Sequence, residues 1–81
     1  MINLEAKTKL NPGEVVIRLK KFFGKEGLGL EMTEDAPLCL TFQGGGGYVT
    51  ATLCLEEGIT RINLLSQEWD RQVKEFITGV S

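Results

Sequence analysis

Apolar and polar residues alternate from residue 28 to residue 64, and no other feature of the sequence constrains the fold as strongly. Strict alternation is typical of strands that bury one face. Turn signals at residues 34–37, 44–47 and 56–58 divide this segment into four predicted strands. Their predicted inward-facing residues are, strand by strand, Leu28, Leu30 and Met32; Leu38, Leu40 and Phe42; Val49, Ala51, Leu53 and Leu55; and Ile62 and Leu64. The segment is therefore predicted to form a sheet with one apolar face.

The strand registers follow from the predicted turns, which are a loop at residues 34–36, a loop at residues 44–47 and a tight turn at residues 57–58. The predicted apolar pairs are Met32–Leu38, Leu30–Leu40, Phe42–Val49, Leu40–Ala51, Leu38–Leu53, Leu53–Ile62 and Ala51–Leu64. Every pair keeps apolar residues on the same face, and a slip of one residue would break all of them. We therefore predict a four-stranded antiparallel meander.

A helix is predicted immediately before the meander. Asn11 suits the N-cap, Pro12 suits the first helical position, and Glu14 stands where a capping box places its acid. Apolar residues then follow at helical spacing, namely Val15, Leu19, Phe22 and Phe23. Gly24 or Gly27 is expected to end this helix in the left-handed conformation.

A second helix is predicted after the meander. Ser66 suits its N-cap, and Glu68 would lie in the first turn near the positive helix end. Its apolar stripe consists of Trp69, Val73, Phe76, Ile77 and Val80. Trp69 is expected to be the central core aromatic of this helix, and Gly79 marks its end.

The predicted fold is a single α+β domain over residues 1–81. Residues 2–7 alternate as well and form a first strand, which gives the order β-α-β-β-β-β-α. Both helices need to bury an apolar stripe, and the apolar sheet face provides the surface for it. This element order resembles one repeat of the TATA-box-binding-protein-like, or helix-grip, architecture. The resemblance implies a five-stranded antiparallel sheet in the order 1-5-4-3-2, with both helices on one face.

The composition argues against most catalytic chemistry. The chain has no histidine, which excludes Ser-His-Asp and Cys-His catalysis and histidine-ligated zinc or haem. The two cysteines, Cys39 and Cys54, form no CxxC motif and are too few for a metal site. On the outer sheet face Cys39 is expected opposite Thr52, and Cys54 opposite Pro37. We predict reduced cysteines, no catalytic residue, no metal and no cofactor, with a redox-sensitive cysteine pair as the alternative.

The sequence favours a cytoplasmic protein. Its apolar runs span only a few residues, whereas a membrane-spanning helix needs about 20. The first residues lack the basic segment and apolar stretch of a signal peptide. No membrane partner is therefore expected.

Basic residues are concentrated near the N-terminus. Residues 1–27 hold six bases and three acids, and residues 28–81 hold three bases and eight acids, so that the net charge of −2 divides into +3 and −5. Four of these bases are predicted on the first helix: Arg18, Lys20, Lys21 and Lys25. They form either a solvated helix flank or a contact for an anion, an acidic protein or RNA. The whole chain is not strongly basic, which makes nucleic acid the less favoured partner.

The outer sheet face is the other candidate interaction surface. Its predicted residues are Glu31, Thr33, Cys39, Thr41, Gln43, Tyr48, Thr50, Thr52, Cys54, Arg61, Asn63 and Leu65. A sheet face without helices can be solvated or can dock a partner. The candidate interaction residues are Thr41, Tyr48, Thr50, Thr52, Arg61 and Asn63. Because Arg61 is the only base among them, DNA binding is poorly supported.

The glycine run and the acid pairs in the predicted turns are interpreted as structural features and not as functional sites. A phosphate-binding loop precedes a helix, whereas residues 44–47, all glycine, precede a predicted strand. A mobile hairpin loop is the favoured interpretation, with close approach to a ligand as the alternative. The acid pairs Glu34–Asp35 and Glu56–Glu57 are interpreted as solubilising turns.

These observations favour a non-enzymatic interaction module that binds a protein partner or a second copy through the open sheet face or an edge strand. One alternative is an RNA- or anion-binding accessory protein that uses the basic helix. Another is a small-ligand carrier with a cavity between helices and sheet. Large side chains are expected to fill that space, which argues against a carrier: Phe22, Phe23, Phe42 and Trp69.

Overall fold

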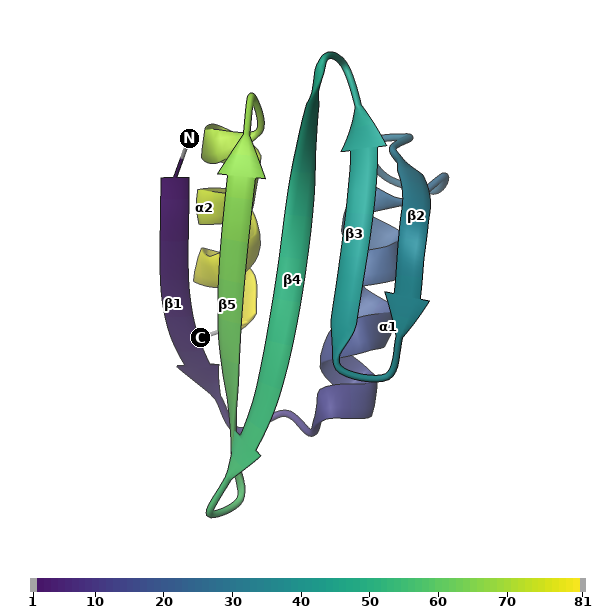
Figure 1. Cartoon of the computed structure of the whole chain (residues 1–81). Helices are drawn as coiled ribbons and strands as arrows, with labels where there is room; N and C mark the ends of the chain where they lie inside the picture. Colours follow the sequence, from purple (N-terminus) through teal and green to yellow (C-terminus); the bar gives the residue numbers. More distant parts are fainter. Residues whose placement is uncertain (1, 81) are drawn as a thin grey trace.

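A computed structural model describes residues 2–80, in which five antiparallel strands form a sheet in the order β1-β5-β4-β3-β2 (Figure 1). The elements are β1 (Ile2–Thr8), α1 (Pro12–Phe23), β2 (Glu31–Ala36), β3 (Cys39–Gly44), β4 (Gly47–Glu56), β5 (Ile59–Gln67) and α2 (Asp70–Val80). The predicted α+β class, the element order and the strand order are confirmed.

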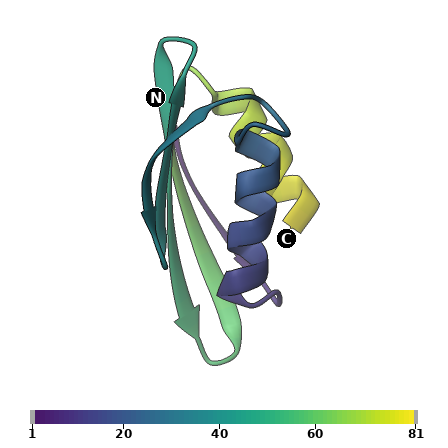
Figure 2. The same ribbon diagram turned by 90° about the vertical axis from the view of Figure 1, so that its right-hand side faces the viewer.

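Both helices lie on the same face of the sheet, and the other face is uncovered (Figure 2). On the covered face, α2 lies behind β1 and β5, and α1 lies behind the other half of the sheet, near β3 (Figure 1). Neither described helix is long and apolar enough to cross a membrane.

Helix α1 begins as predicted but ends differently. The Asn11 side chain accepts a hydrogen bond from the Glu14 backbone N–H at 2.8 Å, as an N-cap should. Gly24 caps the other end with φ −78° and ψ −161°, so the predicted left-handed conformation is wrong. Glycine is required there for a different reason, because an added Cβ would lie 2.3 Å from the Lys20 carbonyl oxygen. The following loop donates N–H groups of Leu28 and Leu30 to the last helical carbonyls.

The registers predicted for β3, β4 and β5 are confirmed. The observed pairs include Phe42–Val49, Leu40–Ala51, Leu53–Ile62 and Ala51–Leu64. The β3–β4 hairpin turns at two glycines rather than four, since Gly45 and Gly46 have φ values of 59° and 82° while Gly44 and Gly47 pair within the strands. Removing one residue from each side of a loop leaves the register unchanged, which is why the pairing was predicted correctly.

The predicted register between β2 and β3 is wrong. Met32 pairs with Phe42, not with Leu38, and Ala36 pairs with Cys39. The chain turns at residues 37–38, so Glu34 and Asp35 lie within β2 instead of forming the predicted turn. Two local effects explain the difference: the proline fits the first position of a tight turn, and a bulge between Met32 and Glu34 adds one residue to β2.

Four other residues that were predicted to face the core from the meander are found in different environments. Leu28 and Leu30 precede β2, which begins at Glu31, although Leu30 is still buried. Leu38 lies in the turn and is 46% exposed. Leu55 has the predicted inward register but is 58% exposed, because the β4–β5 hairpin extends beyond the helices (Figure 1).

Helix α2 begins at Asp70, four residues after the predicted N-cap. Strand β5 continues to Gln67, and Glu68 then adopts a φ of 72°, which turns the chain toward the helix layer. The Ser66 hydroxyl still accepts a hydrogen bond, from the Trp69 N–H at 3.2 Å, but it stabilises this connection and not the helix start. Trp69 therefore lies before α2 and is half-buried, so its predicted central position is wrong. Its indole N–H donates to the Gly44 carbonyl at 2.9 Å.

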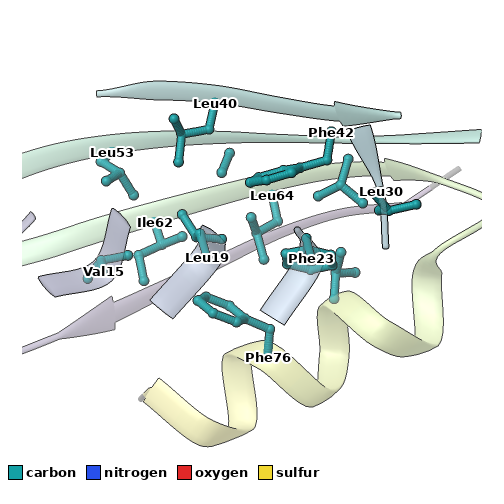
Figure 3. Packing of buried hydrophobic residues seen from close by; sticks show 13 residues of the cluster. Val15, Leu19, Phe23, Leu30, Leu40, Phe42, Leu53, Ile62, Leu64 and Phe76 are labelled. Atoms are coloured by element: carbon teal, nitrogen blue, oxygen red, sulfur yellow. The ribbon is translucent and has the colours of Figure 1, made fainter. Parts of the chain in front are cut away.

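The core lies between the helices and the sheet (Figure 3). Phe23 of α1 is fully buried, and its ring centroid lies 5.6 Å from that of Phe42 and 5.7 Å from that of Phe76. Phe22 completes the group at 4.9 Å from Phe23. Phe76 thus takes the place in the core that the sequence suggested for Trp69.

Candidate functional site

The uncovered sheet face has an uncharged centre, which we call the central patch. It consists of Cys39, Thr41, Tyr48, Thr50, Thr52, Asn63 and Leu65. The strand registers make these residues neighbours, because Thr50 lies between Thr41 and Leu65 in one row across the sheet. In the next row Thr52 lies between Cys39, as predicted, and Asn63. The central patch contains no Asp, Glu, Lys or Arg.

Charged residues surround this patch. Arg61 is the one charged member of the predicted interaction residues on this face, and it lies between Lys7 of β1 and Cys54 of β4 in the register. Its guanidinium forms ion pairs with Glu56 at 2.7 Å and with Glu5 at 3.8 Å. Arg61 is thereby fixed at the margin of the patch, and its charge is already balanced.

Glu34 closes the patch on the β2 side, whereas the sequence predicted Glu31 and Thr33 as the outward residues of this strand. The bulge leaves Thr33 without a register partner and places Glu34 opposite Thr41. The Glu34 carboxylate accepts hydrogen bonds from the Thr41 hydroxyl at 3.3 Å and the Cys39 thiol at 3.4 Å. The bulge was not predictable from alternation, because the charged run of β2 gives no apolar pattern from which to count.

The environment of Cys39 disfavours its thiolate. Partial burial raises the pKa of the Cys39 thiol, and the hydrogen bond to Glu34 and the negative charge of that carboxylate raise it further. A nucleophilic cysteine needs the opposite environment, which lowers its pKa. Both Cys39 and the exposed Cys54 are free. Across residues 2–80 no group of three metal-ligating side chains gathers.

The four basic residues predicted on the first helix do not line one common groove, and Lys25 lies after α1, which ends at Phe23. Lys20, Lys21 and Lys25 line a groove of about 830 Å³ against the start of β2, together with the acids Glu26 and Glu31. The Lys20 ammonium also lies 3.4 Å from the Asp35 carboxylate. Arg18 does not line this groove; it pairs with Glu14 at 3.4 Å and borders, with Lys21, the groove between α1 and α2. The helix therefore presents mixed charge, and not the single basic patch that its sequence suggested.

A more uniformly basic site lies where β1 leads into α1. A groove of about 530 Å³ is lined by Lys7, Thr8, Lys9, Leu10, Arg18, Ile59, Gly79 and Val80. Among residues 2–80, three bases and no acid line it. Sequence reasoning missed it because Lys7 and Lys9 are far from Arg18 along the chain. The excess of bases in residues 1–27 was the available signal, since two of those six are Lys7 and Lys9.

The space between helices and sheet is occupied by side chains, as the phenylalanine contacts show. The groove between α1 and α2, about 330 Å³, is a surface feature bordered by Arg18, Lys21, Phe22, Glu75, Phe76, Gly79 and Val80. The geometry thus shows a core filled by side chains and a sheet face that no helix covers (Figure 2). Comparison with protein-family models and with curated proteins finds no match to this chain.

Proposed function

We propose that this protein is a non-enzymatic interaction module that binds a protein partner through the central patch. One observation carries the proposal: the patch is free of charged residues and is bordered by Glu5, Glu34, Glu56 and Arg61. Protein interfaces have this distribution, with charged residues depleted at the centre, tyrosine enriched and a polar rim. Tyr48 and Leu65 supply the apolar contact area.

The rigidity of the surface supports the same conclusion. The patch residues lie on β3, β4 and β5, which pair continuously, and Tyr48, Thr50 and Leu65 are half-buried by their neighbours. The Thr41 and Thr50 hydroxyl oxygens lie 3.3 Å apart. A surface that is ordered before binding loses little conformational entropy when a partner docks. A protein partner is favoured over nucleic acid because the patch has no base to contact phosphate.

Further parts of the proposal follow from the chemistry of the chain. An enzyme is disfavoured because histidine is absent and the environment of Cys39 suppresses its thiolate. A cytoplasmic location suits two free cysteines, since that compartment keeps thiols reduced. The resemblance to one repeat of the TATA-box-binding-protein-like architecture also stays a proposal, supported by element order and strand order.

The test combines photo-crosslinking with a charge placed in the patch. A photoreactive phenylalanine at position 48 should crosslink a specific protein in the native host. Thr50→Arg should abolish that product, because it places an unpaired charge in the interface. Thr78→Arg is the matched control, on the exposed surface of α2. A product that survives Thr50→Arg, or the absence of any product, would contradict the proposal.

A second candidate function is binding of an anionic ligand in the groove of about 530 Å³, because the described lining, within residues 2–80, has three bases and no acid. Leu10, Ile59 and Val80 add an apolar wall, which suits a ligand with both anionic and apolar parts. Anisotropy titrations with mixed-sequence RNA and with an acidic amphipathic peptide, at about 50 and 200 mM salt, test this candidate. Binding should weaken with salt and with Lys9→Glu, but not with Lys74→Glu.

A further inference from the structure

Strand β1 forms an open and regular edge of the sheet. All seven residues of Ile2–Thr8 pair with β5 in an unbroken register, with neither a bulge nor a proline. Within residues 2–80 no strand pairs with the other side of β1. Its unpaired N–H and C=O groups can therefore hydrogen-bond to an additional strand. Of the features that protect such an edge, β1 lacks a bulge, a proline and an inward-pointing charge, and its one lysine, Lys7, is accompanied by the opposite charge of Glu5 two residues away.

The charges of β1 are complementary to those of a second β1. Glu5 and Lys7 are on the outer sheet face, where they lie opposite Asn63 and Arg61. If two copies of β1 pair antiparallel about Ala6, Glu5 of each copy lies directly opposite Lys7 of the other. Opposite charges in directly facing positions stabilise a strand pair. A slip of two residues in either direction, the smallest that preserves the faces, would place Glu5 opposite Glu5 or Lys7 opposite Lys7.

The helix side of this edge is also suited to a second copy. Ile2 and Leu4 of β1 and Ile77 and Val80 of α2 pack against the core but are only partly buried. Helix α2 lies directly behind β1, so these residues belong to one side of the molecule (Figure 1). In the same pairing Ala6 meets Ala6 at the symmetry axis, where a small side chain permits close approach. A second copy would remove further apolar surface of this group from water.

We propose that the β1 edge binds β1 of a second copy of this chain, in antiparallel register centred on Ala6, and joins the two five-stranded sheets. The symmetry is a two-fold axis through Ala6, which is the commonest arrangement in homo-oligomers. The two central patches then face the same side of one continuous sheet. The proposal concerns a different surface from the central patch, and either can fail without the other.

Charge reversal at both positions provides the test. Sedimentation velocity over a concentration series should show a dimer for the wild-type chain. Glu5→Lys and Lys7→Glu should each weaken it about tenfold or more, because each makes both facing pairs repulsive. An equimolar mixture of the two variants should recover a dimer, and native mass spectrometry should identify it as the mixed species. That recovery is expected when positions 5 and 7 of the two copies lie close together across the interface, because the mixture brings a β1 edge with two lysines against one with two glutamates.

Controls separate this result from misfolding and from the other surface. Glu5 also pairs with Arg61, so Glu5→Lys can affect the fold, whereas no ion pair of Lys7 is observed among residues 2–80. Circular dichroism and a thermal melt check both variants. Lys74→Glu, on exposed α2, makes the same charge change as Lys7→Glu and should leave the dimer intact, as should Thr50→Arg. A monomer at every concentration, or a dimer lost with Thr50→Arg and kept in both reversal variants, overturns the proposal.

Discussion

The two edge strands of the sheet, β1 and β2, differ in regularity and in charge. Strand β1 is regular over its whole length, whereas β2 has a bulge between Met32 and Glu34. Strand β2 also carries acids at three of its six positions, Glu31, Glu34 and Asp35. The Lys20–Asp35 ion pair shows that acids occur on the helix side as well as on the outer face. A second β2 approaching this edge would meet like charges on both faces.

This difference indicates that the chain protects one edge and leaves the other available. A bulge twists an edge strand away from a partner, and charges prevent the approach of another strand. Protection at β2 has a cost, since the acids there replace side chains that could extend the core. The β1 edge keeps Ile2 and Leu4 and places opposite charges two residues apart.

The largest expected effect tests whether the two edges depend on one core. Phe23→Ala should lower the free energy of unfolding by about 3–5 kcal/mol, because a buried ring is lost between Phe42 and Phe76. Hydrogen exchange should then accelerate in β1 and β2 together. Half-buried Phe22→Ala should cost less. If β1 keeps its protection in Phe23→Ala while β2 loses it, the edges belong to separate cooperative units and the comparison fails.

A second, smaller effect should be specific to the β1 side. The buried Thr60 hydroxyl donates to the Leu10 carbonyl at 2.7 Å and so anchors the chain where β1 leads into α1. Thr60→Val keeps the shape but leaves that carbonyl unpaired, which should cost about 1–3 kcal/mol. Chemical denaturation measures the loss, and hydrogen exchange should accelerate first at the end of β1.

The same substitution on the open sheet face is the control. Thr50→Val removes a hydroxyl that only meets Thr41 on the outer surface, so it should change stability by no more than about 0.5 kcal/mol. Equal costs for Thr60→Val and Thr50→Val would show that the hydrogen bond to Leu10 does not anchor this side of the sheet.

The contrast between the edges also explains which parts of the fold could be predicted. Strands β3, β4 and β5 alternate cleanly, and their glycine-containing turns fix the count. Every predicted pair among them lies within the observed strands except Leu38–Leu53 and Cys54–Pro37, because Leu38 and Pro37 fall in the turn at residues 37–38. Strand β2 has little apolar pattern, and charge alone suggested a turn where the chain continues as a strand. The start of α2 was misplaced because Ser66 has the chemistry of an N-cap but lies in β5.

The candidate site was predictable in its centre and not at its margin. The uncharged residues of the central patch follow from the register of β3 with β4 and β5. The margin depends on β1 and β2, where Glu5 pairs with Arg61 and the bulge brings Glu34 beside Cys39. Contacts of that kind join residues distant in sequence and depend on side-chain conformation, which alternation does not encode.

Neutralising the protected edge should make β2 resemble β1. The combined variant Glu31→Gln, Glu34→Gln and Asp35→Asn removes three like charges, so concentration-dependent association should appear in sedimentation velocity. Stability should change by no more than about 1 kcal/mol, because the ion pair lost with Lys20 is exposed. Glu57→Gln, Glu68→Gln and Glu75→Gln together are the control with the same change in charge. If both triple variants associate equally, net charge and not edge protection governs solubility.

The smallest expected effect is a change in the reactivity of the Cys39 thiol, which lies on β3 beside the protected β2 edge. Because the pKa of Cys39 is raised by partial burial and by Glu34, less thiolate is present at a given pH, and alkylation should be slow. In a Cys54→Ser background, the midpoint of the rate of iodoacetamide alkylation against pH should lie above that of an unstructured cysteine peptide. Glu34→Gln should move the midpoint down only in part, since burial remains. Glu31→Gln is the control: Glu31 lies in the same strand as Glu34, but among residues 2–80 the thiol bonds to Glu34 and not to Glu31. This variant should leave the midpoint unchanged. If Glu34→Gln has no effect, the carboxylate does not rest against Cys39 in solution, and β2 is more mobile than its pairing with β3 indicates.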